Sequence, residues 1–411
     1  VVLEPMNHTM TPPLGAPPLY ADGNLITANI AEAKRMGMAA TLLHWTLHPW
    51  AAYSVVALSL SIFCYNKNLP LSIRSAFYPI LGERTWGWPG HIIDISAVFA
   101  TLAGLATSLG FGAEQASAGL GYLFDFKPDM MTKIIIIFGI TAVALFSVVR
   151  GLNGGVKLLS EINLAMAIVL LLFVWFLGPT LDILSGIFSH LTAFAVEFPQ
   201  LSNWVGREDT DYYHGWTTMY WAWWIAWSPF VGMFIARISK GRTVREFILC
   251  VILVPSLVCT VWMVVFGTTA IDQFVSSGYT GVVDTINQWA PELSLFKMLD
   301  EMPFTQITSL VGIVLVLVFF ITSLDSGSLV IDIITAGGKI DAPLPQRIFW
   351  CCFEALIAIA LLAGGGLKAL QAFAIAMGFP FCLILIVMCF SLWKGLRSEH
   401  QLAAASLGKA L

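Results

Sequence analysis

Long apolar runs limit what this 411-residue chain can fold into more than any other feature of its sequence. A helix that crosses a bilayer needs about 20 apolar residues, whereas barrel strands are much shorter and alternate in polarity. Because 58% of the residues are hydrophobic and only 11% are charged, runs of this length recur along the chain. Nine of them are expected to cross as helices: 41–64, 92–117, 132–150, 157–178, 213–236, 244–271, 307–335, 347–365 and 370–394. The predicted fold class is therefore an all-α polytopic membrane protein, because lipid offers no hydrogen-bond partner to backbone N–H and C=O groups that a helix would otherwise pair.

Lys and Arg are distributed unevenly between the connections that join these runs. On one side of the membrane the connections hold 14 of them and on the other side 7, which accounts for all 21. The positive-inside rule then places the 237–245 loop and the C-terminus in the cytoplasm, and the 179–212 and 272–306 loops outside. Nine crossings put the polar, Pro-rich opening 1–40 outside as well, which suggests that further spans precede Val1.

The stretch 216–245 is the most unusual part of the chain. It reads WTTMYWAWWIAWSPFVGMFIARISKGRTVR, and a Ser-Pro break follows four closely spaced tryptophans. At about 100° per residue, Tyr220, Trp224 and Trp227 line one helix face. Electron-rich rings attract a quaternary ammonium, which has no N–H to satisfy, by about 0.5–2 kcal/mol per desolvated ring. The alternative is an interfacial aromatic belt, but a belt usually places only one or two tryptophans at a span end. The four residues are Trp221, Trp223, Trp224 and Trp227.

A second aromatic group, HWTLHPWAAY, occurs near the outer end of the first run. Trp50 and Tyr53 are helix neighbours, but Trp45 lies about 140° from Trp50 on an ideal helix. These rings converge only if Pro49 kinks the helix. Alone, the group is more typical of a belt; paired with the tryptophans of the later run, it favours a cage for a cation.

Hydroxyl groups cluster inside one apolar run, in FFITSLDSGSLVID at 319–332. Hydroxyls and backbone carbonyls bind Na⁺ where a transporter helix unwinds in a cavity. The alternative is hydrogen bonding between helices. A glycine-rich run, 99–121, indicates close helix packing and also contains Thr101. Intramembrane acids are functional candidates by default, although several lie near span ends: Glu114, Glu161, Asp325, Asp332 and Glu354.

Other function classes find little support. The sequence contains no nucleophile–base pair, phosphate loop or metal-binding cluster, so an enzyme is not expected. The seven cysteines lack metal or disulfide spacing, and the scattered basic residues do not favour nucleic acid. The apolar stretch 180–198, which Ser, His and Asp interrupt, has two readings: an amphipathic helix at the outer interface or a loop packed on the bundle.

The tryptophan stretch resembles the signature of the betaine/choline/carnitine transporters. HWTLHPWAAY, GHIIDIS…TSLG, TSLDSGS and FSLWKGLR resemble the same family in the same order, over nearly the whole chain. The resemblance implies a five-plus-five inverted-repeat transporter, often a homotrimer, whose first repeat is N-terminally incomplete here. It divides the chain into an opening segment that includes the end of a truncated helix (1–40), the rest of the first repeat (41–178), an outer helix and loop (179–212), a complete second repeat (213–394) and a short cytoplasmic tail (395–411).

The resemblance also implies which residues form the sites. An aromatic box for the trimethylammonium group would comprise Trp45, Trp50, Tyr53 and Trp224, and Trp221, Trp223 and Trp227 match neighbouring positions on the permeation path. Phe319, Thr322 and Ser323 match one sodium site. Thr101 and Phe230 match a second ion site, where Leu105 replaces the hydroxyl of sodium-coupled members. Val231 replaces a sulfur side chain of a sodium-independent exchanger, which favours ion coupling.

The expected function is import of a quaternary ammonium osmolyte, glycine betaine or choline, through the inner (plasma) membrane by ion-coupled alternating access. No cofactor is expected apart from Na⁺ as the coupling ion. The alternatives are a sodium-independent exchanger of carnitine-like substrates and an osmolyte sensor that does not transport. The sequence does not identify which of these compounds is the substrate, since an aromatic cage recognises only the methylated cation that they share. It also does not distinguish Na⁺ from H⁺ as the coupling ion.

Overall fold

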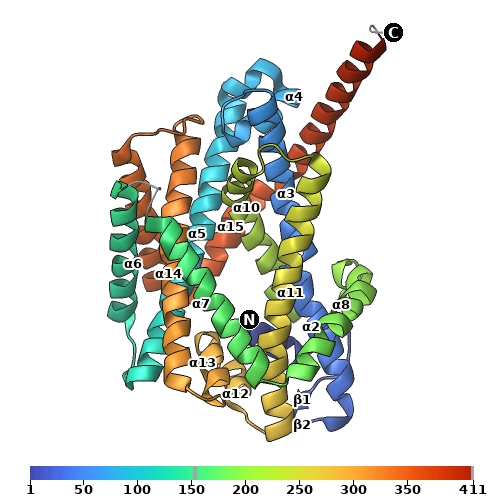
Figure 1. Cartoon of the computed structure of the whole chain (residues 1–411), viewed down its shortest axis with the longest axis vertical. Coiled ribbons are helices and arrows are strands. Elements are labelled where there is room, and N and C mark those ends of the chain that lie inside the picture. Colours follow the sequence, from blue (N-terminus) through green and yellow to red (C-terminus); the bar gives the residue numbers. More distant parts are fainter. Residues whose placement is uncertain (151–154, 409–411) are drawn as a thin grey trace. The chain divides into compact units, whose positions relative to one another are not determined.

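The computed structural model describes residues 1–150 and 155–408, and these residues are almost entirely helical (Figure 1). Within them, eight helices are long and apolar enough to cross a membrane. This confirms the predicted all-α polytopic fold, whereas the five-plus-five repeat stays a prediction. The 151–154 part of one connection and the last three residues of the predicted tail lie outside the described residues.

The long helices correspond to the apolar runs, and shorter helices fill the connections. Their bounds are α1 Leu3–Met10, α2 Ile30–Trp45, α3 Leu47–Leu60, α4 Tyr78–Leu81, α5 Trp88–Phe124, α6 Met130–Arg150, α7 Gly155–Leu177, α8 Thr180–Ser202, α9 Thr210–Tyr212, α10 Met219–Ile238, α11 Val244–Ser277, α12 Gly281–Asn287, α13 Ser294–Asp300, α14 Thr305–Thr335 and α15 Leu344–Gly408. The strands β1 (Tyr20–Ala21) and β2 (Asn24–Leu25) form a hairpin whose two turn residues, Asp22 and Gly23, have positive φ.

Two breaks interrupt the long helices, one within a predicted run and one between two predicted runs. α2 ends at Trp45 and α3 begins at Leu47, so the first predicted run is two helices joined at Thr46. Pro49 lies in the first turn of α3, where its missing N–H costs little. In α15 the backbone turns at Gly366, which has φ 61° and ψ −146°. The turn lies between the two predicted runs 347–365 and 370–394. Glycine accepts this conformation because it has no Cβ to oppose positive φ.

The eight candidate spans count α2 with α3 as one span and both parts of α15 as one span. They differ from the nine predicted crossings at two further places. α10 has 20 residues, but its tryptophans lower its mean hydropathy, and it is not among the eight. α8 is among them, and it is a helix rather than a loop. It packs on α2, where Arg35 donates to Glu197 at 2.8 Å. Its position at the outer interface stays a prediction.

The first of two compact units comprises residues 1–48, 108–220 and 253–323. Its core includes Met6 of α1, Met38 of α2 and Phe266 of α11, which are all fully buried or nearly so. Two glycines let α1 approach its neighbours closely. A Cβ on Gly37 would lie 2.5 Å from Thr9 Oγ1, and a Cβ on Gly267 would lie 2.5 Å from the Pro5 ring. α1 is therefore held between α2 and α11.

An ion pair fixes the segment that precedes α9 in this unit. Arg207 donates through Nε and Nη2 to the two oxygens of Asp209, each at 2.6 Å, and the Leu14 N–H donates to the same carboxylate at 3.1 Å. Burial opposes ionisation of Asp209, but these donors outweigh it and lower the pKa of its carboxyl group. The pair thus ties the opening segment to the chain just before the tryptophan stretch.

The second unit comprises residues 49–107, 221–252 and 324–411 as far as they are described. Phe63, Phe77, Met233 and Phe381 lie in its core. Three glycines bring α10 close to the helices around it. A Cβ on Gly232 would lie 2.5 Å from Val56 of α3, one on Gly104 would lie 2.8 Å from the Trp227 ring, and one on Gly378 would lie 2.5 Å from the Ala222 carbonyl oxygen. The tryptophans of α10 are therefore held against α3, α5 and α15.

Candidate functional site

Aromatic rings from α3 and α10 come together inside the second unit. The Tyr53 ring lies 5.4 Å from Trp50 and 6.1 Å from Trp224, and both pairs meet edge to face at 84°. Trp223 stacks on Trp224 at 5.7 Å and 17°. Perpendicular and parallel rings in one group expose both edges and faces, and the faces carry the negative part of the ring quadrupole. Four of the predicted binding residues are thus neighbours.

The remaining predicted rings of α10 lie beside this group. Trp227 is 9% exposed and its ring lies 5.3 Å from Phe230. Its indole also packs over Gly104 of α5. Trp221 is partly exposed. Trp45, which the sequence assigns to the same box, belongs to the first unit.

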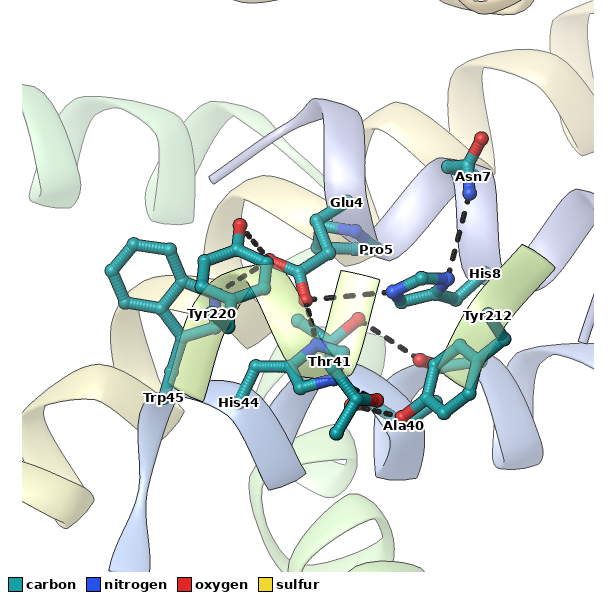
Figure 2. Close-up of polar contacts among 12 residues, drawn as sticks. Glu4, Pro5, Asn7, His8, Ala40, Thr41, His44, Trp45, Tyr212 and Tyr220 are labelled. Atoms are coloured by element: carbon teal, nitrogen blue, oxygen red, sulfur yellow. Dashed lines mark hydrogen bonds and ion pairs between the residues drawn. The ribbon is translucent and has the colours of Figure 1, made fainter. Parts of the chain in front are cut away.

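Trp45 takes part in a buried polar network of the first unit, which Figure 2 shows. The Glu4 carboxylate accepts hydrogen bonds at one oxygen, Oε2, from Trp45 Nε1 at 2.5 Å and from the Tyr220 hydroxyl at 2.7 Å. Its other oxygen, Oε1, lies 2.6 Å from His44 Nδ1. Glu4 is 3% exposed and His44 is fully buried. A carboxylate from α1 therefore sets the positions of side chains from α2 and α10.

His44 forms a hydrogen bond through each of its ring nitrogens. A carboxylate only accepts, so Nδ1 carries the hydrogen that points at Glu4. Nε2 lies 2.9 Å from Thr217 Oγ1 and is hydrogen-bonded to that hydroxyl. The His44 ring also stacks on Tyr220 at 4.8 Å and on Tyr212 at 5.3 Å. His44 thus couples the carboxylate of α1 to the segment that leads into α10.

The same cluster offers three atoms that could bind a metal ion. Glu4, His8 and His44 contribute one atom each, and these lie within 4.8 Å of one another. Tetrahedral ligands about 2.0–2.1 Å from zinc would be about 3.3 Å apart. His44 Nδ1 and Glu4 Oε1 are 2.6 Å apart, which is a hydrogen bond with no room for an ion. The geometry therefore fits a hydrogen-bonded network better than a metal centre.

Sequence reasoning missed Glu4, His8 and His44. The opening segment is too polar to cross a membrane, so its acid was not among the intramembrane candidates. One signal was available: Glu4 and His8 are four residues apart, a spacing that puts both on one face of a helix. Their partners on α2 and α10 are distant in sequence and could be found only from the structure.

The predicted ion-binding residues are divided between the two units. Thr322 and Ser323 lie in the first unit with Phe319, which is 49% exposed. Thr322 Oγ1 donates to the Phe319 carbonyl oxygen at 2.9 Å, and α14 is helical throughout. The unwound backbone on which the sodium argument relied is thus not seen here. In the second unit, Thr101 Oγ1 donates to the Ala97 carbonyl oxygen at 2.8 Å, and Phe230 is buried. Both ion sites stay predictions.

The acids within the apolar runs fall into two groups. Glu114 accepts from Lys133 Nζ at 2.6 Å, and Asp325 accepts from Arg347 at 3.1 Å. Glu354 is fully buried in α15, and within the described residues neither of its carboxyl oxygens has a hydrogen-bond partner. Leaving such a group unsatisfied costs about 1–3 kcal/mol.

Replacing Glu354 with methionine is therefore expected to stabilise the protein by about 1–3 kcal/mol, because it removes two unsatisfied oxygens from a buried site. The thermal melting temperature of the purified protein in detergent measures this change. Glu114→Met is the matched control and should lower the melting temperature, since it leaves Lys133 without its carboxylate. A lower melting temperature for Glu354→Met would contradict the expectation.

Comparison with known proteins supplies the family. Residues 1–401 match the profile of the BCCT family, the betaine/carnitine/choline family transporters. The chain belongs to the betaine/carnitine/choline transporter family. It is therefore a multi-pass membrane transporter and not an enzyme, as the sequence predicted.

Several relatives of this transporter have assigned substrates. It is 59% identical over 377 residues to a glycine betaine/proline/choline transporter of Vibrio parahaemolyticus, covering 92% of this chain and 68% of the relative. It is 54% identical to glycine betaine transporter 1 of the same species, over 92% and 72% of the two chains. It is 41% identical to a glycine betaine transporter of Acinetobacter baylyi, over 97% and 58%.

Proposed function

We propose that this transporter imports a quaternary ammonium osmolyte, glycine betaine or choline, by ion-coupled alternating access. The relatives named for these substrates support the substrate class. The observation that carries the proposal is the ring group of Trp50, Tyr53, Trp223 and Trp224 within the second unit. The trimethylammonium head would lie on these ring faces, with Trp45 taking part as the family resemblance implies.

Ring faces suit this head for a physical reason. A quaternary nitrogen has no hydrogen to donate, so moving it out of water leaves no donor unsatisfied. Its charge, spread over the methyl groups, is attracted to each ring by about 0.5–2 kcal/mol. In the proposed cycle, Trp221 and Trp227 line the path beside the ring group, and the bundle that carries 213–236 changes position while the cation stays desolvated.

Several further assignments belong to the same proposal. The coupling ion would be Na⁺, bound at Phe319, Thr322 and Ser323, with Thr101 and Phe230 at a second site. The protein would act in the inner membrane as a homotrimer, with the basic 237–245 loop and the C-terminus in the cytoplasm, because positive loops stay inside.

Uptake measurements test the function directly. The full-length protein in liposomes should accumulate radiolabelled glycine betaine or choline against its gradient when an inward Na⁺ gradient is imposed. Uptake driven only by an H⁺ gradient would show that the coupling ion is H⁺ and not Na⁺. Counterflow without gradient-driven accumulation would indicate an exchanger, and binding without any flux would indicate a sensor.

Removing one hydroxyl tests the sodium site. Thr322→Ala should raise the Na⁺ concentration for half-maximal uptake about fivefold, the scale of one lost polar contact. Thr308→Ala is the matched control, since Thr308 is also on α14 and also donates to its own helix, at 3.2 Å to the Thr305 carbonyl oxygen. An unchanged Na⁺ dependence in Thr322→Ala would remove this residue from the ion site.

A further inference from the structure

The buried carboxylate of Glu4 has an unusual set of partners. It forms contacts with two neutral donors, Trp45 and Tyr220, and with two histidines, and no Lys or Arg in the part of the chain that the structure describes forms an ion pair with it. His44 donates through Nδ1 to one oxygen of this carboxylate, and His8 Nε2 lies 3.5 Å from the same oxygen. The carboxylate thus lies in the protein interior with two neutral donors and two histidines as its partners.

That charge acts directly on two aromatic rings. The indole N–H of Trp45 and the O–H of Tyr220 both point at Glu4 Oε2, at 2.5 and 2.7 Å. A hydrogen bond to an ionised acceptor is stronger than a neutral one and draws the donor proton toward the carboxylate. Electron density then shifts into the rings, whose centroids lie 5.5 Å apart at 66°. Ring faces that carry more electron density attract a cation more strongly.

We propose that Glu4 is a specificity-determining residue, which orients the rings of Trp45 and Tyr220 and makes them selective for a substrate head that carries positive charge. The inference rests on the proposed function, because it takes Trp45 as part of the cation site. It goes further by assigning the preference for charge, as opposed to shape, to a carboxylate outside the aromatic box. His44, which is itself hydrogen-bonded to Thr217, holds that carboxylate in place at its other oxygen.

A pair of ligands that differ only in charge tests the inference. Choline has a neutral isostere, 3,3-dimethyl-1-butanol, in which carbon replaces the quaternary nitrogen. The charge selectivity is the ratio of the inhibition constants of the isostere and of choline, measured against labelled glycine betaine uptake by the full-length protein in liposomes. Glu4→Gln keeps the size of the side chain and removes its charge. It should reduce this ratio about tenfold, the combined effect of weaker attraction to two rings.

Controls separate this role from a packing role. Glu161→Gln should leave the ratio unchanged. Glu161 is exposed, and its ion pair is with Lys157, at 3.8 Å, and not with an aromatic ring of the site. If Glu4→Gln does not reach the membrane, Tyr220→Phe keeps the ring, removes its bond to Glu4, and should still reduce the ratio several-fold. Weaker binding of choline and isostere by the same factor would reduce Glu4 to a packing residue and overturn the inference. Wild-type protein that recognises neither choline nor glycine betaine would instead overturn the proposed function, and the inference with it.

Discussion

Replacing Trp224 with alanine should lower the affinity for glycine betaine and choline about 30-fold, which corresponds to about 2 kcal/mol for one desolvated ring. Trp224 contacts Tyr53 edge to face and stacks on Trp223, so its removal also takes one ring contact from each of these side chains. The half-saturation constant for uptake of each labelled substrate into liposomes measures the effect.

Two variants define what the Trp224 result means. Trp224→Phe keeps an aromatic face and should lose only part of the affinity. Trp88→Ala removes a tryptophan that is 73% exposed at the start of α5, and it should leave uptake unchanged. Equal uptake by Trp224→Ala and the wild-type protein would show that the ring group does not bind the substrate.

Asp94 of the GHIIDIS stretch should have the largest effect on stability. Its side chain is almost fully buried and accepts hydrogen bonds from Ser72 Oγ at 2.5 Å, from the Arg74 N–H at 2.9 Å and from Arg74 Nε. Asp94→Ala leaves a partly buried guanidinium without its carboxylate, which costs about 3–5 kcal/mol. The expected result is a large fall in thermal melting temperature or loss of folded protein.

A second aspartate gives the comparison for Asp94. Asp129 precedes α6 and accepts from the Thr132 N–H at 2.8 Å, as a helix N-cap does, but it is exposed. Asp129→Ala should therefore cost only about 1 kcal/mol. If Asp94→Ala melted at the same temperature as Asp129→Ala, the Asp94 contacts would contribute no more than an exposed cap.

The sequence predicted the features that depend on local pattern. The apolar runs correspond to long helices because a crossing helix needs continuous apolar length, and the turn at Gly366 lies between two predicted runs. The prediction that Trp50 and Tyr53 are helix neighbours is also confirmed, since their rings are in contact. The extent of α2 was missed because its first turns are polar, with Arg35 bonded to Glu32 and Glu197.

What the sequence could not supply are contacts between distant segments. Glu4 lies in a segment that is too polar to be taken for part of the membrane domain, and its partners are 40 and 216 residues away. The sequence named Pro49 as the residue that would have to kink the helix for the rings to converge. The break between α2 and α3 instead lies at Thr46, and Pro49 is accommodated in the first turn of α3. The hydroxyl patch suggested an unwound helix at 319–323, whereas α14 continues through it.

The central claim is that aromatic rings hold a fully methylated ammonium head. Competition for labelled glycine betaine uptake by glycine bearing three, two, one and no N-methyl groups tests it most directly. We predict that affinity falls at each step, because every methyl lost exposes an N–H that ring faces cannot satisfy. Equal competition by all four compounds would contradict the account.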